Sequence, residues 1–256
     1  MRQKIILLTG ASGSLGRAII ENSDSNKNFF ILIDRKSKKF SNFLAFLKKN
    51  DYNFFKFETD FQNIKQINEL TIKIRKKFKL IDVIINNAAF TGDEKLKGWN
   101  VNFQKQSADT FLNCLTVNLV APFVIIRDLS SLLNRSKFQS IINIGSIYAD
   151  TAPKNFLYKD LKMNNPAAYG SSKAALLNLT KWFAVNLGPK IRVNMISPGG
   201  IERSQNNKFI RRYESVTPLH RMAKESDILG IIDFLSSNNS KYITGQNIKV
   251  DGGFAN

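Results

Sequence analysis

The amino-acid sequence predicts an α/β fold in which helices cover both faces of a single parallel sheet. Short apolar runs alternate along the chain with longer stretches of helical apolar spacing. The first two runs, Ile5–Leu8 and Phe29–Ile33, are apolar throughout, which is typical of strands buried on both faces. The chain has 256 residues and shows neither an internal repeat nor a linker, so we expect a single domain spanning residues 1–256.

The later elements keep the same alternation. The remaining strands are expected at 53–57, 81–86, 138–145, 191–196 and 247–250. The helices between and after them are expected at about 38–49, 63–78, 107–134, 167–187 and 224–236.

A glycine-rich turn, Thr9–Gly16, follows the first strand and leads into the helical spacing of Arg17–Ile20. Strand, turn and helix in this order are the context of a dinucleotide fingerprint, although the spacing here is G-x-x-G-x-x-G. In a doubly wound sheet of Rossmann type, the helix N-terminus receives the pyrophosphate. The residues expected to hold the cofactor here are Gly10, Ser12, Gly13, Ser14, Leu15 and Gly16.

Asp34 stands at the end of the second strand, about 20 residues beyond the glycine turn. A carboxylate at this position accepts the adenosine ribose hydroxyls and repels a 2′-phosphate, which favours NAD(H). The cations Arg35, Lys36, Lys38 and Lys39 favour a phosphate instead. NADP(H) therefore stays open as the alternative.

Tyr169 and Lys173 are four residues apart in the helix expected at 167–187, so they share one helix face. A phenol has an ordinary pKa of about 10 and is almost inert as a base at neutral pH. A nearby ammonium, together with a cationic cofactor ring, would lower that pKa. The pair therefore indicates an acid/base built from tyrosine.

The chain resembles the short-chain dehydrogenase/reductase family in six motifs that follow one another in order. They are Thr9–Gly16, Asn86-Asn87-Ala88-Ala89, Asn118, Ser146, Tyr169 with Lys173, and Pro198-Gly199. The resemblance covers essentially the whole chain. It implies one doubly wound domain that binds a nicotinamide dinucleotide and assembles into a dimer or tetramer.

The resemblance also implies a role for each site residue. Tyr169 is the acid/base, and Lys173 lowers its pKa and holds the nicotinamide ribose. Ser146 hydrogen-bonds the reacting oxygen, and Asn118 supports a water that relays protons. Further along the cofactor, the resemblance implies contacts with Asp34, Arg35, Asp60, Phe61, Asn86, Asn87, Ala88, Ala89, Pro198, Gly199 and Ile201.

Three segments, at about 90–105, 147–166 and 200–222, are expected to form substrate loops. The 23 positions from Ser146 to Tyr169 exceed the usual family spacing, and the pattern loosely resembles a subgroup from flagellin-modification and surface-glycan gene sets. Residues 200–222 carry Arg203, Arg211, Arg212 and Tyr213, and arginine suits phosphate or carboxylate groups. We therefore expect a small-molecule substrate, with an anionic group as one option.

The leading hypothesis is an NAD(P)-dependent oxidoreductase that interconverts a secondary alcohol and a ketone, on a sugar or sugar-derived substrate of surface-glycan biosynthesis. One alternative is a 3-oxoacyl-carrier-protein reductase, since a positive surface suits an acidic carrier. The other is a catalytically silent dinucleotide-binding regulatory protein, against which the complete set of Asn118, Ser146, Tyr169 and Lys173 argues.

Several partners and compartments are disfavoured. The net charge of +18 comes from lysines spread over nearly every expected helix, so no nucleic-acid partner is expected. The single Cys114 and the lone His220 offer no metal site, and Cys114 is expected in the core. No apolar run is expected to span a membrane and no signal peptide is seen, which favours a cytoplasmic protein.

The helices at about 107–134 and 167–187 carry more apolar residues than one buried stripe needs. We expect part of this surface to pack on a second subunit, in a homodimer or homotetramer. Burial entirely within one chain is the alternative.

Overall fold

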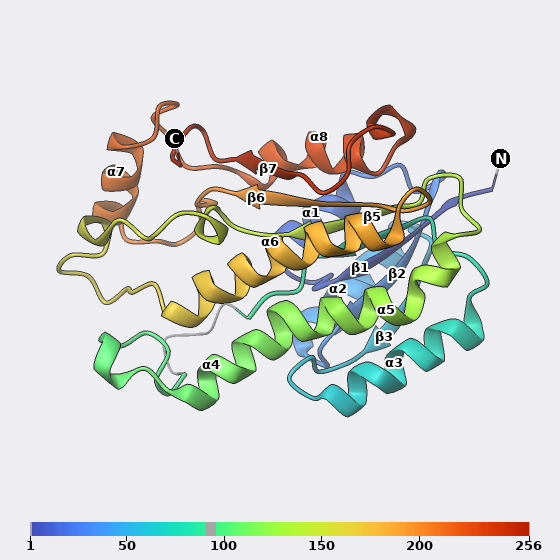
Figure 1. The fold of residues 1–256 in the computed structure, drawn as a ribbon, viewed down its shortest axis with the longest axis horizontal. Coiled ribbons are helices and arrows are strands. Elements are labelled where there is room, and N and C mark those ends of the chain that lie inside the picture. Colours follow the sequence, from blue (N-terminus) through green and yellow to red (C-terminus); the bar gives the residue numbers. More distant parts are fainter. Residues whose placement is uncertain (1, 91–95, 256) are drawn as a thin grey trace.

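The computed structural model describes residues 2–90 and 96–255, and in this part of the chain seven strands form one parallel sheet (Figure 1). The strands lie in the order β3-β2-β1-β4-β5-β6-β7. Their bounds are β1 Lys4–Thr9, β2 Asn28–Asp34, β3 Phe54–Glu58, β4 Val83–Asn86, β5 Ser140–Ile144, β6 Arg192–Pro198 and β7 Asn247–Val250. The predicted single-domain, doubly wound α/β fold of Rossmann type is thereby confirmed.

The helices alternate with these strands as expected. They are α1 Ser14–Glu21, α2 Lys38–Lys49, α3 Ile64–Lys77, α4 Ala108–Leu115, α5 Ala121–Leu133, α6 Ala167–Leu187, α7 Asn207–Ser215 and α8 Glu225–Leu235. Side chains of Ser37, Asn63 and Ser107 cap α2, α3 and α4 by accepting hydrogen bonds from first-turn N–H groups.

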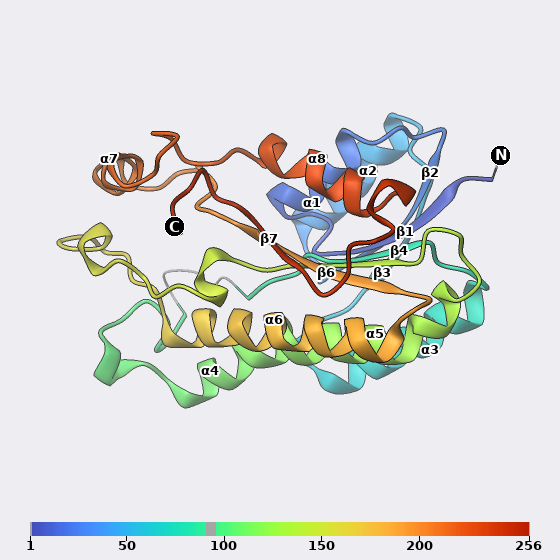
Figure 2. The same cartoon turned by 45° about the horizontal axis from the view of Figure 1, so that its top comes forward.

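Helices cover both faces of the sheet. Figure 2 shows α3, α4, α5 and α6 in one layer and α1, α2 and α8 in the other. Alternate side chains of the central strands serve the two cores: Leu7 of β1 packs with α3 and α5, whereas Leu8 packs with α1 and α8. Burial on both faces is the reason that these strands are apolar throughout.

The strand order reverses at β1, which pairs with β2 on one side and β4 on the other. Ligands of open α/β sheets bind beyond the carboxyl ends of the strands at such a point. Thr9, Asp34, Asn86 and Ile144 are the last residues of β1, β2, β4 and β5. The topology thus brings the predicted site residues to one edge of the sheet.

Residues Ala108–Leu133 form one helix, because the π-helical segment η2 (Thr116–Val120) joins α4 to α5. Among the described residues, this is the one helix whose length and apolar composition would allow it to cross a membrane. The expectation that no apolar run reaches that length was therefore wrong. Half of the apolar stretch is buried in the protein, and the helix packs on α3 and α6. A core helix passes the same test, so length and composition alone assign no membrane partner.

Helix α7, which lies within the expected loop 200–222, was not predicted as a helix. Its Arg212 donates from Nη1 to the carbonyl of Lys159 at 2.6 Å, and its Tyr213 is buried and stacks on Phe254 with ring centroids 4.4 Å apart. Both residues join α7 to the 147–166 segment and to the C-terminal residues, because a nonpolar cluster fills the space between these three segments. The expectation that residues 200–222 form a substrate loop stays a prediction.

Candidate active site

The glycine turn adopts a conformation that requires glycine at two positions. Gly10 has a φ of +66°, in the left-handed region that other residues rarely adopt. A Cβ on Gly16 would lie 2.3 Å from the carbonyl oxygen of Gly10, so only glycine lets α1 approach this closely. The turn is therefore tight for the reason that the sequence motif predicts.

The N-terminus of α1 is suited to an anion. Its N-cap residue, Gly13, provides no side-chain cap, and the first turn contains no acidic residue. No carboxylate of the first turn therefore competes for its backbone N–H groups and the helix dipole, as a pyrophosphate requires. The residues present fit a dinucleotide, whose phosphates Gly13, Ser14 and Leu15 would hold.

The segment after β4 supports the glycine turn. The side chain of Asn87 donates to the carbonyls of Thr9 and Gly10 at 3.0 and 3.1 Å, and the backbone N–H of Ala88 donates to the hydroxyl of Thr9. Asn86 instead donates to the Asn143 side chain within the sheet and is buried. The expectation that Asn86 lines the cofactor was wrong, because the pleat of β4 turns its side chain into the core.

Hydrogen bonds connect the Asp34 carboxylate to the glycine turn. Its Oδ2 accepts from both the backbone N–H and the hydroxyl of Ser12 at 2.8 Å, and its Oδ1 accepts from the N–H of Arg35. These hydrogen bonds hold the carboxylate at the end of β2. The sequence indicated the position of Asp34 but not Ser12 as its partner.

Asp60 and Phe61 follow β3 on the same side of the sheet. Phe61 is buried, whereas Asp60 is exposed and accepts from the N–H of Gln62. The N–H of Asp60 donates to the side chain of Gln66 at 3.0 Å. The adenine contact of these residues stays a prediction.

Ser146, Tyr169 and Lys173 come together at the carboxyl end of β5. The Ser146 hydroxyl interacts with the Tyr169 phenol and lowers its pKa. The Lys173 ammonium lies 5.8 Å from the centre of the Tyr169 ring and donates to the carbonyl of Ile144 at 2.8 Å. Ser146 and Lys173 are buried, and Tyr169 is half-buried.

Burial dominates the electrostatics of this site. It lowers the pKa of Lys173 from its ordinary value of 10.5 to about 8. It also raises the pKa of Tyr169, which the Ser146 side chain and the positive charge of Arg203 lower to a smaller extent. The lowering of the Tyr169 pKa that we expected is therefore absent from the protein alone. The cationic ring of an oxidised cofactor would supply this lowering.

Asn118 lies inside the π-helical segment η2, a type of irregularity that is frequent at functional sites. It is buried, accepts from the N–H of Phe90 at 2.6 Å and donates to the hydroxyl of Ser172 at 2.9 Å. Ser172 in turn donates to the carbonyl of Tyr169. Asn118 thus holds the helix that carries Tyr169, and its proposed water relay stays a prediction.

Pro198 ends β6, and Gly199 and Gly200 follow at the same edge. A Cβ on Gly199 would lie 2.9 Å from the Cα of Asp251 and from the hydroxyl of Tyr213. The N–H of Gly200 donates to the hydroxyl of the buried Tyr213 at 2.7 Å. Ile201 forms a parallel bridge with Ala223, so this loop is fixed by backbone contacts.

The sequence did not single out two further tyrosines and an asparagine beside the catalytic pair. Tyr148 and Tyr158 share a hydrogen bond of 2.8 Å between their hydroxyls, and the side chain of Asn165 lowers the pKa of both phenols. Burial outweighs this effect and raises the pKa of both phenols above the ordinary value. The only sequence signal for them was the unusual length of the segment after Ser146.

The other expectations concern the substrate loops, metals and Cys114. Within the loop at 90–105, residues 91–95 lie outside the described residues. In the described parts of the chain, no group of three or more His, Cys, Asp or Glu side chains could hold a metal ion. Cys114 is fully buried, and burial raises the pKa of its thiol.

A dinucleotide-binding turn and a Ser–Tyr–Lys set, at the same edge of one doubly wound sheet, define an oxidoreductase that acts on a CH–OH group with a nicotinamide dinucleotide.

The comparisons with known proteins agree with this class. Residues 10–255 match the profile of the family described as Enoyl-(Acyl carrier protein) reductase. The chain is 29% identical to the post-translational flagellin modification protein A of Campylobacter coli, over 99% of both proteins. It is 31% identical to a 3-oxoacyl-[acyl-carrier-protein] reductase of Buchnera aphidicola, over 98% of this chain and 97% of that protein.

Among solved structures, a short-chain dehydrogenase of Leptospira borgpetersenii with bound NAD+ matches with a TM-score of 0.80 and 30% identity. The match covers 100% of this chain and 94% of that one. The protein belongs to the short-chain dehydrogenase/reductase family.

Proposed function

We propose that this protein interconverts a secondary alcohol and a ketone on a sugar or sugar-derived substrate of surface-glycan biosynthesis, with NAD(H) as the preferred cofactor. The observation that carries the chemistry is the contact of Ser146, Tyr169 and Lys173 at the carboxyl edge of the sheet. The full-length similarity to a flagellin modification protein supports the sugar substrate. We place the reaction in the cytoplasm.

Each residue of the set has a separate task. When bound, the nicotinamide accepts or supplies the hydride. Tyr169 takes the proton from the alcohol oxygen in oxidation and returns it to the carbonyl oxygen in reduction. The Ser146 hydroxyl holds that oxygen as charge develops on it, and Lys173 keeps a buried positive charge beside the phenol. Gly13 and the first turn of α1 bind the phosphates, and Asp34 takes the ribose hydroxyls.

A 3-oxoacyl-carrier-protein reductase is the second candidate, favoured by 31% identity to such an enzyme. The positive net charge also suits an acidic carrier protein. The long segment between Ser146 and Tyr169 opposes it, because the start of this segment, Ile147–Ala149, packs on α6, the helix that carries Tyr169. A silent regulatory protein is the third candidate.

A substrate screen separates the three candidates. Sugars, sugar nucleotides and β-ketoacyl thioesters are supplied with NAD+ or NADH, and absorbance at the reduced nicotinamide band is followed. We expect turnover with a sugar-derived compound, and none in the Tyr169→Phe variant. Turnover of β-ketoacyl thioesters alone would establish the reductase instead, and binding without any turnover would establish the silent protein.

The fixed carboxylate of Asp34 leads to a prediction about the cofactor. A 2′-phosphate would stand against a carboxylate that Ser12 and Arg35 hold in place, so NADP(H) should bind on the order of 10-fold to 100-fold more weakly than NAD(H). Isothermal titration of both cofactors measures this ratio. Asp34→Asn removes the negative charge at nearly constant shape and should reduce the preference for NAD(H) over NADP(H). Tighter binding of NADPH to the wild type would show that the Arg35/Lys36 cluster governs the pocket.

A second prediction concerns assembly through α4 and α6. Leu112, Trp182 and Val185 expose 60%, 53% and 81% of their surface on these two contacting helices, which is unusual for large apolar side chains. We propose that this surface packs on a second subunit, in a closed dimer or tetramer. Light scattering should give a mass well above the 29.0 kDa of one chain.

Val185→Glu should shift that assembly toward monomer, because a charge would have to be buried at the interface. Ile72→Glu is the matched control, since Ile72 is also an exposed apolar residue but stands on α3. A wild-type monomer at micromolar concentration, or dissociation by the α3 control alone, would refute the interface.

A further inference from the structure

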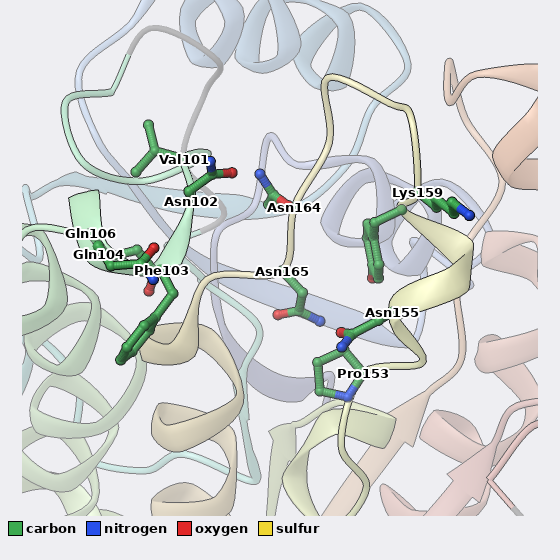
Figure 3. Close-up of a pocket in the computed structure, with 11 residues that line it drawn as sticks. Val101, Asn102, Phe103, Gln104, Gln106, Pro153, Asn155, Lys159, Asn164 and Asn165 are labelled. Carbon is green, nitrogen blue, oxygen red and sulfur yellow. The ribbon is translucent and has the colours of Figure 1, made fainter.

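A cleft of about 430 Å³ lies between two segments that the sequence predicts as substrate loops (Figure 3). One wall is built by residues 101–106, including the short helix η1 (Phe103–Lys105), and the other by residues 153–165. The volume falls within the range of small-ligand pockets. We call it the carboxamide cleft.

Six side-chain carboxamides line this cleft, and none of its lining residues is acidic. They belong to Asn102, Gln104, Gln106, Asn155, Asn164 and Asn165. Figure 3 shows the glutamines and Asn165 on opposite sides of the cleft. Each carboxamide offers two N–H donors and one acceptor oxygen, which complement the hydroxyl groups of a sugar.

Four of these carboxamides are available to a ligand. The side chains of Asn102, Gln104, Asn155 and Asn164 make no hydrogen bond with any other described residue. The ring of Phe103 is 76% exposed at the same cleft. An aromatic face next to neutral hydrogen-bonding groups suits a ring that carries C–H bonds on its faces and hydroxyls on its rim.

Two contacts connect the cleft to the catalytic residues. The side chain of Gln106 accepts from the N–H of Ala167, two residues before Tyr169. On the opposite wall, the hydroxyl of Tyr158 shares a hydrogen bond of 2.8 Å with that of Tyr148, two residues after Ser146. A substrate whose reacting carbon lies at Ser146 and Tyr169 can therefore extend into the cleft.

We infer that the carboxamide cleft binds a neutral, hydroxyl-rich ring of the substrate that does not itself react. The inference rests on the proposed function, of which it specifies the substrate: a sugar unit attached next to the oxidised or reduced carbon. The acyl chain of a carrier-bound ketone offers no hydroxyls to these amides, so it would make no use of their hydrogen-bonding groups.

The test measures binding separately from turnover. Saturation-transfer NMR with the NAD+-saturated protein compares myo-inositol, which carries six hydroxyls, with cyclohexanol, which carries one. We expect a clear inositol signal and a much weaker cyclohexanol signal. The triple variant Asn102→Leu/Gln104→Met/Asn155→Leu should bind inositol at least about 10-fold more weakly, because three hydrogen-bonding groups are lost at nearly constant shape.

Asn68→Leu, an exposed amide on α3, is the matched control and should bind inositol like the wild type. Unchanged NAD+ affinity and melting temperature establish that the triple variant is folded. Equal inositol binding by the triple variant and the wild type would refute the assignment of the carboxamide cleft as a sugar-binding site, whatever the substrate screen finds. Binding that depends on the three amides, without turnover of any sugar, would support the cleft and refute the proposed reaction.

Discussion

Tyr169→Phe is expected to lower turnover by at least about 10³-fold while leaving dinucleotide affinity close to that of the wild type. The substitution removes one hydroxyl, which is the proposed proton carrier and the partner of Ser146. The ring and its neighbours stay in place, so the glycine turn and Asp34 keep their contacts with the cofactor. Steady-state kinetics and isothermal titration measure the two quantities.

The pH dependence gives this prediction a second readout. Burial raises the pKa of Tyr169, so in the wild type the rate of alcohol oxidation should increase with pH as the phenol loses its proton. Residual oxidation by the phenylalanine variant should lack that dependence. Tyr158→Phe is the matched control, because Tyr158 is a half-buried phenol whose hydroxyl contacts that of Tyr148. A Tyr169→Phe enzyme with a tenth of wild-type activity would refute the assignment.

Lys173→Met is expected to abolish most turnover and at the same time to stabilise the fold. The ammonium is 2% exposed and donates a single described hydrogen bond, to Ile144. Its pKa falls from 10.5 to about 8 on burial, which corresponds to an unfavourable contribution of about 3 kcal/mol at neutral pH. Loss of the hydrogen bond offsets part of this, so the variant should gain about 1–3 kcal/mol of unfolding free energy.

The stabilisation expected for Lys173→Met depends on pH. The folded state releases the Lys173 proton more easily than the unfolded state does, so the penalty is fully present below pH 8 and disappears as the pH rises toward 10.5. The stability difference between variant and wild type should therefore narrow over that interval. Chemical denaturation of the cofactor-free protein at pH 7 and pH 10 measures it.

The exposed Lys181, on the same helix, provides the control. Lys181→Met should change neither activity nor the pH dependence of stability. A Lys173→Met variant that is less stable than the wild type at pH 7 would contradict the account, as would one that keeps a tenth of the activity. Stabilisation together with lost activity would place Lys173 among residues kept for function at a cost to the fold.

The positions of much of the active site could be predicted from local sequence patterns. The glycine turn, Asp34, Ser146 and the Tyr169/Lys173 pair each lie where a strand ends or where helical spacing sets a shared face, and such positions follow from periodicity alone. The two neighbouring asparagines show the limit of this reasoning. Asn86 and Asn87 differ only in which side of the backbone they occupy, and the pairing of β4 with β5 turned Asn86 into the sheet.

By itself, the sequence determined the order of strands and helices, the parallel sheet and the identity of the residues at its carboxyl edge. These depend on apolar spacing and on glycine at fixed positions, which are properties of short segments. The tertiary structure decided which distant residues meet: Ser12 with Asp34, Asn118 with Ser172, and Tyr148 with Tyr158. It also decided the pKa of Lys173 and formed the carboxamide cleft from two separate segments, because burial and through-space contact arise only when the chain has folded.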